Sequence, residues 1–133
     1  MRVFFDPSAF AKRCVKEAGT EHVLSWCERA DELTLCVIAL PEMVSAACRL
    51  RREGRSTPPQ YRQIKQDLIA DPGDARLCNI TPTLLQFAVQ ALEAGTLRGM
   101  DAMHIAAAQA MEAEVFVAAD APHALPRAHR DCG

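Results

Sequence analysis

Four acidic residues occupy equivalent places along this sequence of 133 residues, each beside a predicted strand end or helix start. Asp6 directly follows the first short apolar run, and Asp120 directly follows the last one. Glu42 lies one residue after Pro41, in the first turn of a predicted helix, and Asp101 begins an alanine-rich helix. In an open parallel sheet the carboxyl ends of the strands face one edge, and ligands bind where the strand order reverses. We therefore expect these acids to meet in one cleft.

Local structure alone explains any single one of these acids, because acids near helix starts cap the helix and stabilise it by about 0.3–1 kcal/mol. Asp6 and Asp120 differ in sitting beside apolar strand residues, where an unpaired carboxylate is costly unless a cation meets it. Clustered carboxylates select hard cations, which predicts Mg²⁺ or Mn²⁺ as the ligand. Such an ion polarises a phosphoryl oxygen and activates water, so the predicted chemistry is phosphodiester hydrolysis.

The six cysteines and four histidines show no zinc-binding pattern, since there is no C-x-x-C pair and no zinc-finger spacing. The amino terminus has only three apolar residues before Asp6, too few for the apolar core of a signal peptide. We therefore expect a cytoplasmic protein with reduced thiols. No segment approaches the roughly 20 apolar residues of a membrane-spanning helix, so we expect no membrane span.

The composition describes one globular domain, with 50% apolar and 24% charged residues. A chain of this length buries about 68–70% of its unfolded surface and needs no metal merely to fold, so a metal would serve chemistry. The formal charge of −2 gives no global basic field. A nucleic-acid substrate would have to be held by a local patch.

The apolar periodicity predicts strands separated by helices. The strands are expected over residues 2–5, 33–39, 77–80 and 114–118, and the helices over 7–17, 21–29, 41–52, 58–70, 82–92 and 100–111. This alternation favours a single α/β domain over residues 1–133, with a parallel sheet of four or five strands covered by helices in three layers. Residues 121–133 contain Pro122 and Pro126 and no run suited to a further strand, so an irregular tail is predicted.

Four stretches occur in the order and spacing of a known family. They are FDPSAFAK at 5–12, LPEMVSAA at 40–47, LRGMDAMHIAAA at 97–108 and VFVAAD at 115–120. Together they resemble the PIN-domain ribonucleases, in particular the VapC-type toxins of bacterial toxin–antitoxin pairs. The resemblance spans residues 2–120, nearly the whole chain.

The resemblance implies a role for each matching residue. Asp6, Glu42 and Asp101 match the family's acids that bind the divalent ion, and Asp120 matches a more variable fourth acid. Ser8 matches a small hydroxyl residue beside the metal site, although a serine there also suits a helix cap. The implied protein is a Mg²⁺/Mn²⁺-dependent endoribonuclease that hydrolyses RNA, with a three-layer PIN-like fold. It would be the toxin of a type II toxin–antitoxin system, would form a homodimer and would be blocked by a cognate antitoxin.

Two departures from the family pattern keep a second hypothesis open. Pro7 and Ala118 stand where the family often has Thr or Ser, and the tail lacks the helix and last strand of many members. A catalytically degenerate PIN-like domain that serves as a binding module is the alternative. A phosphoacceptor signalling domain is disfavoured because no lysine stands at a late strand end, and a dehalogenase-type phosphatase because Ser8 occupies the place of its second aspartate.

Other polar side chains near these motifs have simpler interpretations. Arg98, three residues before Asp101, is a candidate for contacting RNA phosphate or for balancing the acids. His104, one turn after Asp101, is predicted to be a packed, hydrogen-bonded side chain rather than a metal ligand. The remaining cations near helix ends are interpreted as dipole partners and solvated surface; they are Lys12, Arg13, Lys16, Arg49, Arg51, Arg52 and Arg55.

Overall fold

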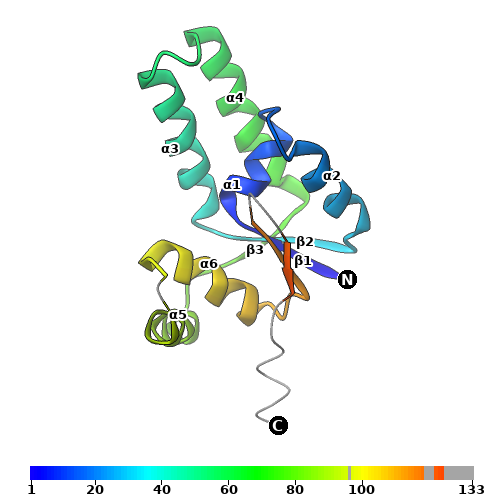
Figure 1. The fold of residues 1–133 in the computed structure, drawn as a ribbon, viewed down its shortest axis with the longest axis vertical. Helices are drawn as coiled ribbons and strands as arrows, with labels where there is room; N and C mark the ends of the chain where they lie inside the picture. The colour runs from blue at the N-terminus through cyan, green and yellow to red at the C-terminus, as the bar shows by residue number, and fades with distance from the viewer. Residues whose placement is uncertain (96, 119–121, 125–133) are drawn as a thin grey trace.

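A five-stranded sheet forms the middle of the molecule (Figure 1). The computed structural model describes residues 1–95, 97–118 and 122–124. The strands are β1 (Arg2–Phe5), β2 (Glu32–Cys36), β3 (Arg76–Cys78), β4 (Val115–Val117) and β5 (Pro122–Ala124), in the spatial order β3-β2-β1-β4-β5. The first four run parallel, and β5 pairs antiparallel with β4.

Helices cover both faces of the sheet, as Figure 1 shows, with α1–α4 on one side and α5 and α6 on the other. They are α1 (Pro7–Phe10), the short 3-10 helix η1 (Ala11–Arg13), α2 (Thr20–Arg29), α3 (Ala39–Arg52), α4 (Pro58–Ala70), the 3-10 helix η2 (Asp71–Asp74), α5 (Pro82–Ala94) and α6 (Gly99–Ala110). The predicted α/β domain of three layers is confirmed. Among the described residues, none of the helices combines the length and the apolar character that crossing a membrane requires.

The central strand β1 joins two apolar clusters. Its side chains Val3, Phe4 and Phe5 are all fully buried. Successive side chains of a strand point to opposite faces of the sheet. Val3 and Phe5 therefore pack in the cluster with α1–α4, and Phe4 packs in the cluster with α5 and α6, where its ring stacks on Phe116 at 5.6 Å between centroids. A strand covered on both faces is expected to be apolar, as Val3–Phe5 are, and β1 carries charge only at its first residue, Arg2.

Small side chains let α6 approach the sheet closely. Four of its alanines are fully buried: Ala102, Ala106, Ala107 and Ala108. They pack in the same cluster as Phe4 of β1 and Cys36 of β2. The backbone of α6 is thereby held near the strands at the point where β2 leads into α3.

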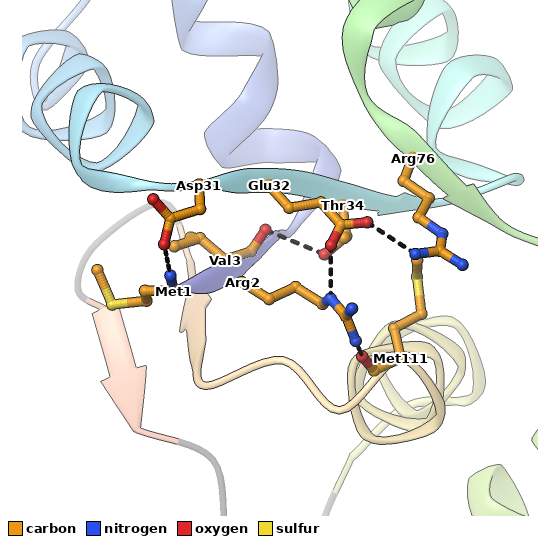
Figure 2. Close-up of polar contacts among 8 residues, drawn as sticks. All are labelled: Met1, Arg2, Val3, Asp31, Glu32, Thr34, Arg76 and Met111. Atoms are coloured by element: carbon orange, nitrogen blue, oxygen red, sulfur yellow. Dashed lines mark hydrogen bonds and ion pairs between the residues drawn. The ribbon is translucent and has the colours of Figure 1, made fainter.

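The amino ends of three parallel strands are joined by a charged network (Figure 2). Arg2 Nε donates to Glu32 Oε2 at 2.8 Å, and Arg76 Nη1 donates to Glu32 Oε1 at 3.0 Å. These two hydrogen bonds, that of Arg2 first, hold the pKa of the Glu32 carboxyl below its ordinary value. The Thr34 hydroxyl also donates to the Val3 carbonyl at 3.0 Å. The network ties β1, β2 and β3 together at the end opposite the predicted acids.

The predicted end of one helix and the predicted start of another need correction. The first helix was expected over 7–17, but α1 ends at Phe10 and the chain tightens into η1 up to Arg13, as helix ends often do. The third was expected to open at Pro41, but α3 begins at Ala39. Proline is tolerated there because the first-turn backbone N–H groups have no partner within the helix. The predicted capping box at Thr57 and Gln60 is confirmed.

The prediction that the tail contains no strand is wrong for Pro122–Ala124, which form β5. Its partner β4 would otherwise lie at the edge of the sheet. Pro122 is the first residue of an edge strand, a position where the missing backbone N–H costs no ladder hydrogen bond. The sequence signal was missing because β5 has only three residues.

Candidate active site

The strand order reverses beside the central strand. From β1 the chain moves to β2 and then β3, with the connecting helices on one face, and it returns through α5 and α6 on the other face to place β4 on the far side of β1. In open α/β sheets ligands bind outside the carboxyl ends of the strands at such a reversal. Asp6 directly follows β1 and therefore lies at this position.

Asp6 is held rigidly by short-range contacts. Its backbone N–H donates to the Val117 carbonyl at the end of β4 at 3.0 Å. Its side chain caps α1, since Oδ1 accepts the Ser8 backbone N–H at 2.8 Å and the Ser8 hydroxyl at 2.6 Å. Ser8 thus hydrogen-bonds to Asp6, and the helix cap that the sequence also allowed for Ser8 is Asp6 itself. The other carboxylate oxygen, Oδ2, has no hydrogen bond within the described part of the chain.

Glu42 is joined to α6 by one short hydrogen bond. His104 Nε2 lies 2.6 Å from Glu42 Oε1. The histidine side chain is 2% exposed, whereas that of Glu42 is 30% exposed. The His104 ring also packs against Phe4 of β1, 6.4 Å between centroids. The prediction that His104 is a packed, hydrogen-bonded side chain is confirmed.

Asp101 lies in the first turn of α6 and is exposed. Residues three apart on a helix are neighbours on its surface, with Cβ atoms about 5–6 Å apart, so Asp101 lies beside His104. His104 therefore links the two elements, because it lies one turn after Asp101 in α6 and contacts Glu42 of α3. Arg98 is the exposed residue before α6, and within the described residues it forms no ion pair with Asp101. The idea that Arg98 balances the acids finds no such contact here.

The acids lie on elements at one end of the sheet, but within the described part of the chain they do not form a complete metal-binding site. Within residues 1–95, 97–118 and 122–124, no three His, Cys, Asp or Glu side chains come close enough to hold a metal ion together. The fourth predicted acid, Asp120, lies outside the described residues. The donor chemistry fits a hard divalent cation, because Asp6, Glu42 and Asp101 all retain carboxylate oxygens without a partner in the described region.

A groove that the sequence did not predict begins beside this site. It has a volume of about 310 Å³ and lies between the α1–η1 segment and helices α3 and α4. Ser8 lines it together with two arginines and two glutamates, which are Arg49, Arg55, Glu17 and Glu53. Arg55 Nη1 lies 3.6 Å from Glu53 Oε1. Both arginines were interpreted from sequence as dipole partners of α3. Their spacing near the end of α3 gave no hint of the groove, because the facing helix is distant in the sequence.

The chain resembles known proteins in both sequence and fold. The PIN domain family model matches residues 3–124. Two curated relatives, ribonuclease VapC45 of Mycobacterium tuberculosis strain CDC 1551 and ribonuclease VapC49 of strain H37Rv, are each 29% identical over 109 residues, which cover 82% of this chain and 76% of each relative.

Solved structures share the fold. Mycobacterium tuberculosis VapC20, described as a Sarcin-Ricin loop cleaving toxin, superposes with a TM-score of 0.62 at 15% identity, over 98% of this chain and 95% of that one. A VapBC2 chain from Rickettsia felis, in a structure bound to a DNA fragment from the promoter, gives 0.61 at 11% identity, over 85% and 84%. At such identities the likeness concerns the fold alone.

Proposed function

This chain belongs to the PIN domain family, and from that premise we propose that it is a metal-dependent endoribonuclease acting as one PIN-like domain. The observation that supports this most directly is that three acids lie on elements at the carboxyl end of the sheet. Asp6 ends the central strand, Glu42 is hydrogen-bonded to His104, and Asp101 lies one turn before that histidine. The two curated relatives named as ribonucleases support the same activity.

Asp6, Glu42 and Asp101 are the proposed ligands of a Mg²⁺ or Mn²⁺ ion, with Asp120 as a fourth. When bound, the ion polarises a phosphoryl oxygen of RNA and lowers the pKa of water for hydrolysis. The protein's part is to hold its carboxylates in place. Ser8 fixes one oxygen of Asp6, and the buried imidazole of His104 fixes one oxygen of Glu42.

RNA would be held by local cations, since the whole chain has a formal charge of −2. Arg98 is exposed at the start of α6, beside Asp101. Arg49 and Arg55 line the groove that begins at Ser8. Guanidinium groups bind phosphate in two-pronged geometry, so we assign Arg98 and Arg49 to backbone phosphates of RNA, whereas Arg55 is paired with Glu53.

The biological role that fits best is the toxin of a toxin–antitoxin pair, acting in the cytoplasm as a homodimer that a cognate antitoxin inhibits. The names of the relatives and the recorded VapBC2 assembly support this role. Light scattering of the purified chain tests the dimer. Co-expression with the product of an adjacent small gene tests the antitoxin, since a true antitoxin co-purifies and suppresses RNA cleavage.

The alternative, a PIN-like binding module without catalysis, is favoured by one observation. No three acids are gathered at ligand distance among the described residues. Calorimetric titration with Mn²⁺ separates the two hypotheses when it is repeated on Asp101→Asn. The nuclease binds the ion and loses most of its affinity in the variant, whereas the binding module shows no acid-dependent binding.

The direct test of activity is cleavage of a labelled RNA with Mg²⁺, with Mn²⁺ and with EDTA. We expect cleavage with either ion and none with the chelator. Asp101→Asn should abolish cleavage while its far-ultraviolet circular dichroism stays unchanged, because Asp101 is exposed and makes no polar contact in the described region.

A further inference from the structure

The contact between His104 and Glu42 joins the most buried polar ring of the site to one of its proposed ligands. The His104 side chain is 2% exposed and that of Glu42 is 30% exposed, although their atoms approach to 2.6 Å. The imidazole therefore reaches the carboxylate from the core side. The other side of the carboxylate faces the solvent at the carboxyl end of the sheet.

The chemistry of the pair defines which group donates. An ionised carboxylate only accepts hydrogen bonds, so the hydrogen in this contact belongs to His104 Nε2. His104 Nδ1 is buried and has no hydrogen-bond partner among the described residues. A hydrogen on Nδ1 would be buried without an acceptor, which disfavours the other tautomer. The ring is therefore assigned as a single donor that points at Glu42 Oε1.

The surroundings of His104 keep this donor in a fixed direction. Phe4 of β1, which is fully buried, packs against the ring at 6.4 Å between centroids. Buried Ala102 and Ala106 lie two residues before and after it on α6, against the sheet. A glutamate side chain has several rotatable bonds and loses considerable freedom when it is fixed. A rigid donor from the core reduces that freedom before any ligand arrives.

We propose that His104 is a positioning residue for the Glu42 carboxylate: its Nε2–H holds Oε1, so that Oε2 is presented to a divalent cation bound by the acids at the carboxyl end of the sheet. His104 itself does not touch the ion, because its one available nitrogen is occupied by Glu42 and its ring is buried. The inference rests on the proposed function and adds to it a residue that controls metal affinity. Hydrogen-bond partners of metal ligands typically change affinity or activity by about 10- to 100-fold.

Two substitutions separate positioning from simple packing. His104→Leu places an apolar side chain with high helix propensity at this buried position and removes the Nε2–H donor. His104→Gln places an amide N–H near the position of Nε2 and can restore the hydrogen bond to Glu42. The matched control is Leu84→Ala, which perturbs the same apolar cluster from α5 without a polar group, at a residue that is 0% exposed.

The readout is the dissociation constant for Mn²⁺ alone, measured by calorimetry, beside a thermal melt of each variant. We expect His104→Leu to bind Mn²⁺ about 10- to 100-fold more weakly and His104→Gln to recover most of that loss. Leu84→Ala should melt at a lower temperature with unchanged Mn²⁺ affinity. Equal affinity in His104→Leu and the parent protein, or an equal loss in Leu84→Ala, overturns the positioning role while leaving the nuclease intact. A parent protein that neither binds Mn²⁺ nor cleaves RNA overturns the proposed function, and this inference with it.

A second measurement needs neither metal nor a variant of His104 that folds. Long-range ¹H–¹⁵N spectra report which imidazole nitrogen carries the hydrogen. We expect a protonated Nε2 and an unprotonated Nδ1 for His104 in the metal-free protein, with a shift of the Nε2 resonance in Glu42→Gln. A hydrogen found on Nδ1 alone, or an Nε2 signal indifferent to Glu42→Gln, contradicts the proposal.

Discussion

Asp6 caps α1 and is a proposed metal ligand, and a pair of substitutions distinguishes these two roles. As the cap of α1 it accepts two hydrogen bonds from Ser8 through Oδ1, and as a proposed ligand it contributes negative charge through its carboxylate. Asp6→Asn keeps an oxygen that can accept both hydrogen bonds and removes the charge. Asp6→Ala removes both.

The expected magnitudes follow from these contacts. Asparagine and aspartate cap helices about equally well, so Asp6→Asn should alter the free energy of unfolding by only a few tenths of a kcal/mol. Asp6→Ala should cost about 1 kcal/mol, which for a chain of this length lowers the melting temperature by about 3–4 °C. Cleavage should fall by more than about 100-fold in both variants, because even hydrogen-bond partners of metal ligands cost 10- to 100-fold.

The assay pairs initial rates on a labelled RNA at saturating Mn²⁺ with thermal melts of the same protein preparations. An EDTA-treated sample of the parent protein sets the background rate. Full cleavage by Asp6→Asn would refute the assignment of Asp6 to the site. A melting temperature for Asp6→Asn as low as that of Asp6→Ala would refute the capping argument, since the two variants differ in their ability to accept from Ser8.

Three further predictions concern other contacts. Because the hydrogen bonds from Arg2 and Arg76 hold the pKa of Glu32 below its ordinary value, their stabilisation is present at neutral pH and is lost as the pH falls through the lowered value. The urea midpoints of the parent and Glu32→Gln should therefore differ at pH 7 and converge as the pH falls below that lowered pKa. A constant difference would count against the network. Burial, followed by the charge of Asp71, raises the pKa of the free Cys14 thiol to about 11. Its alkylation by iodoacetamide at pH 8, followed by mass spectrometry, should therefore be far slower than in the protein unfolded in urea. Equal rates would show that the thiol is not shielded. Ser8→Ala removes the hydroxyl contact to Asp6 and leaves the backbone N–H contact. It should lower the free energy of unfolding by about 0.5–1.5 kcal/mol in a denaturant titration and reduce cleavage less than Asp6→Asn does. A loss of cleavage as large as that of Asp6→Asn would place Ser8 among the essential groups.

Local patterns in the sequence were sufficient to place the first four strands and the helices, and to put Asp6, Glu42 and Asp101 beside strand ends and helix starts. The order of strands and helices follows from apolar periodicity, and the start of α4 follows from the capping box of Thr57 and Gln60. The positions of Asp6 after β1 and Asp101 at the start of α6 were likewise readable, because a strand end and a helix start are defined by a few neighbouring residues. The family resemblance, confirmed over residues 3–124, rests on the same short motifs.

Contacts between distant residues were decided only by the tertiary structure. His104 and Glu42 are separated by 62 positions in the sequence, and their hydrogen bond exists because buried alanines bring α6 close to the start of α3. The antiparallel edge strand β5 and the groove with Arg49 and Arg55 also depend on which element lies opposite. Periodicity and capping are properties of a few consecutive residues, so a sequence reveals them directly. A groove or a pair of side chains from two helices is created by packing, and packing determines which polar groups finally face one another.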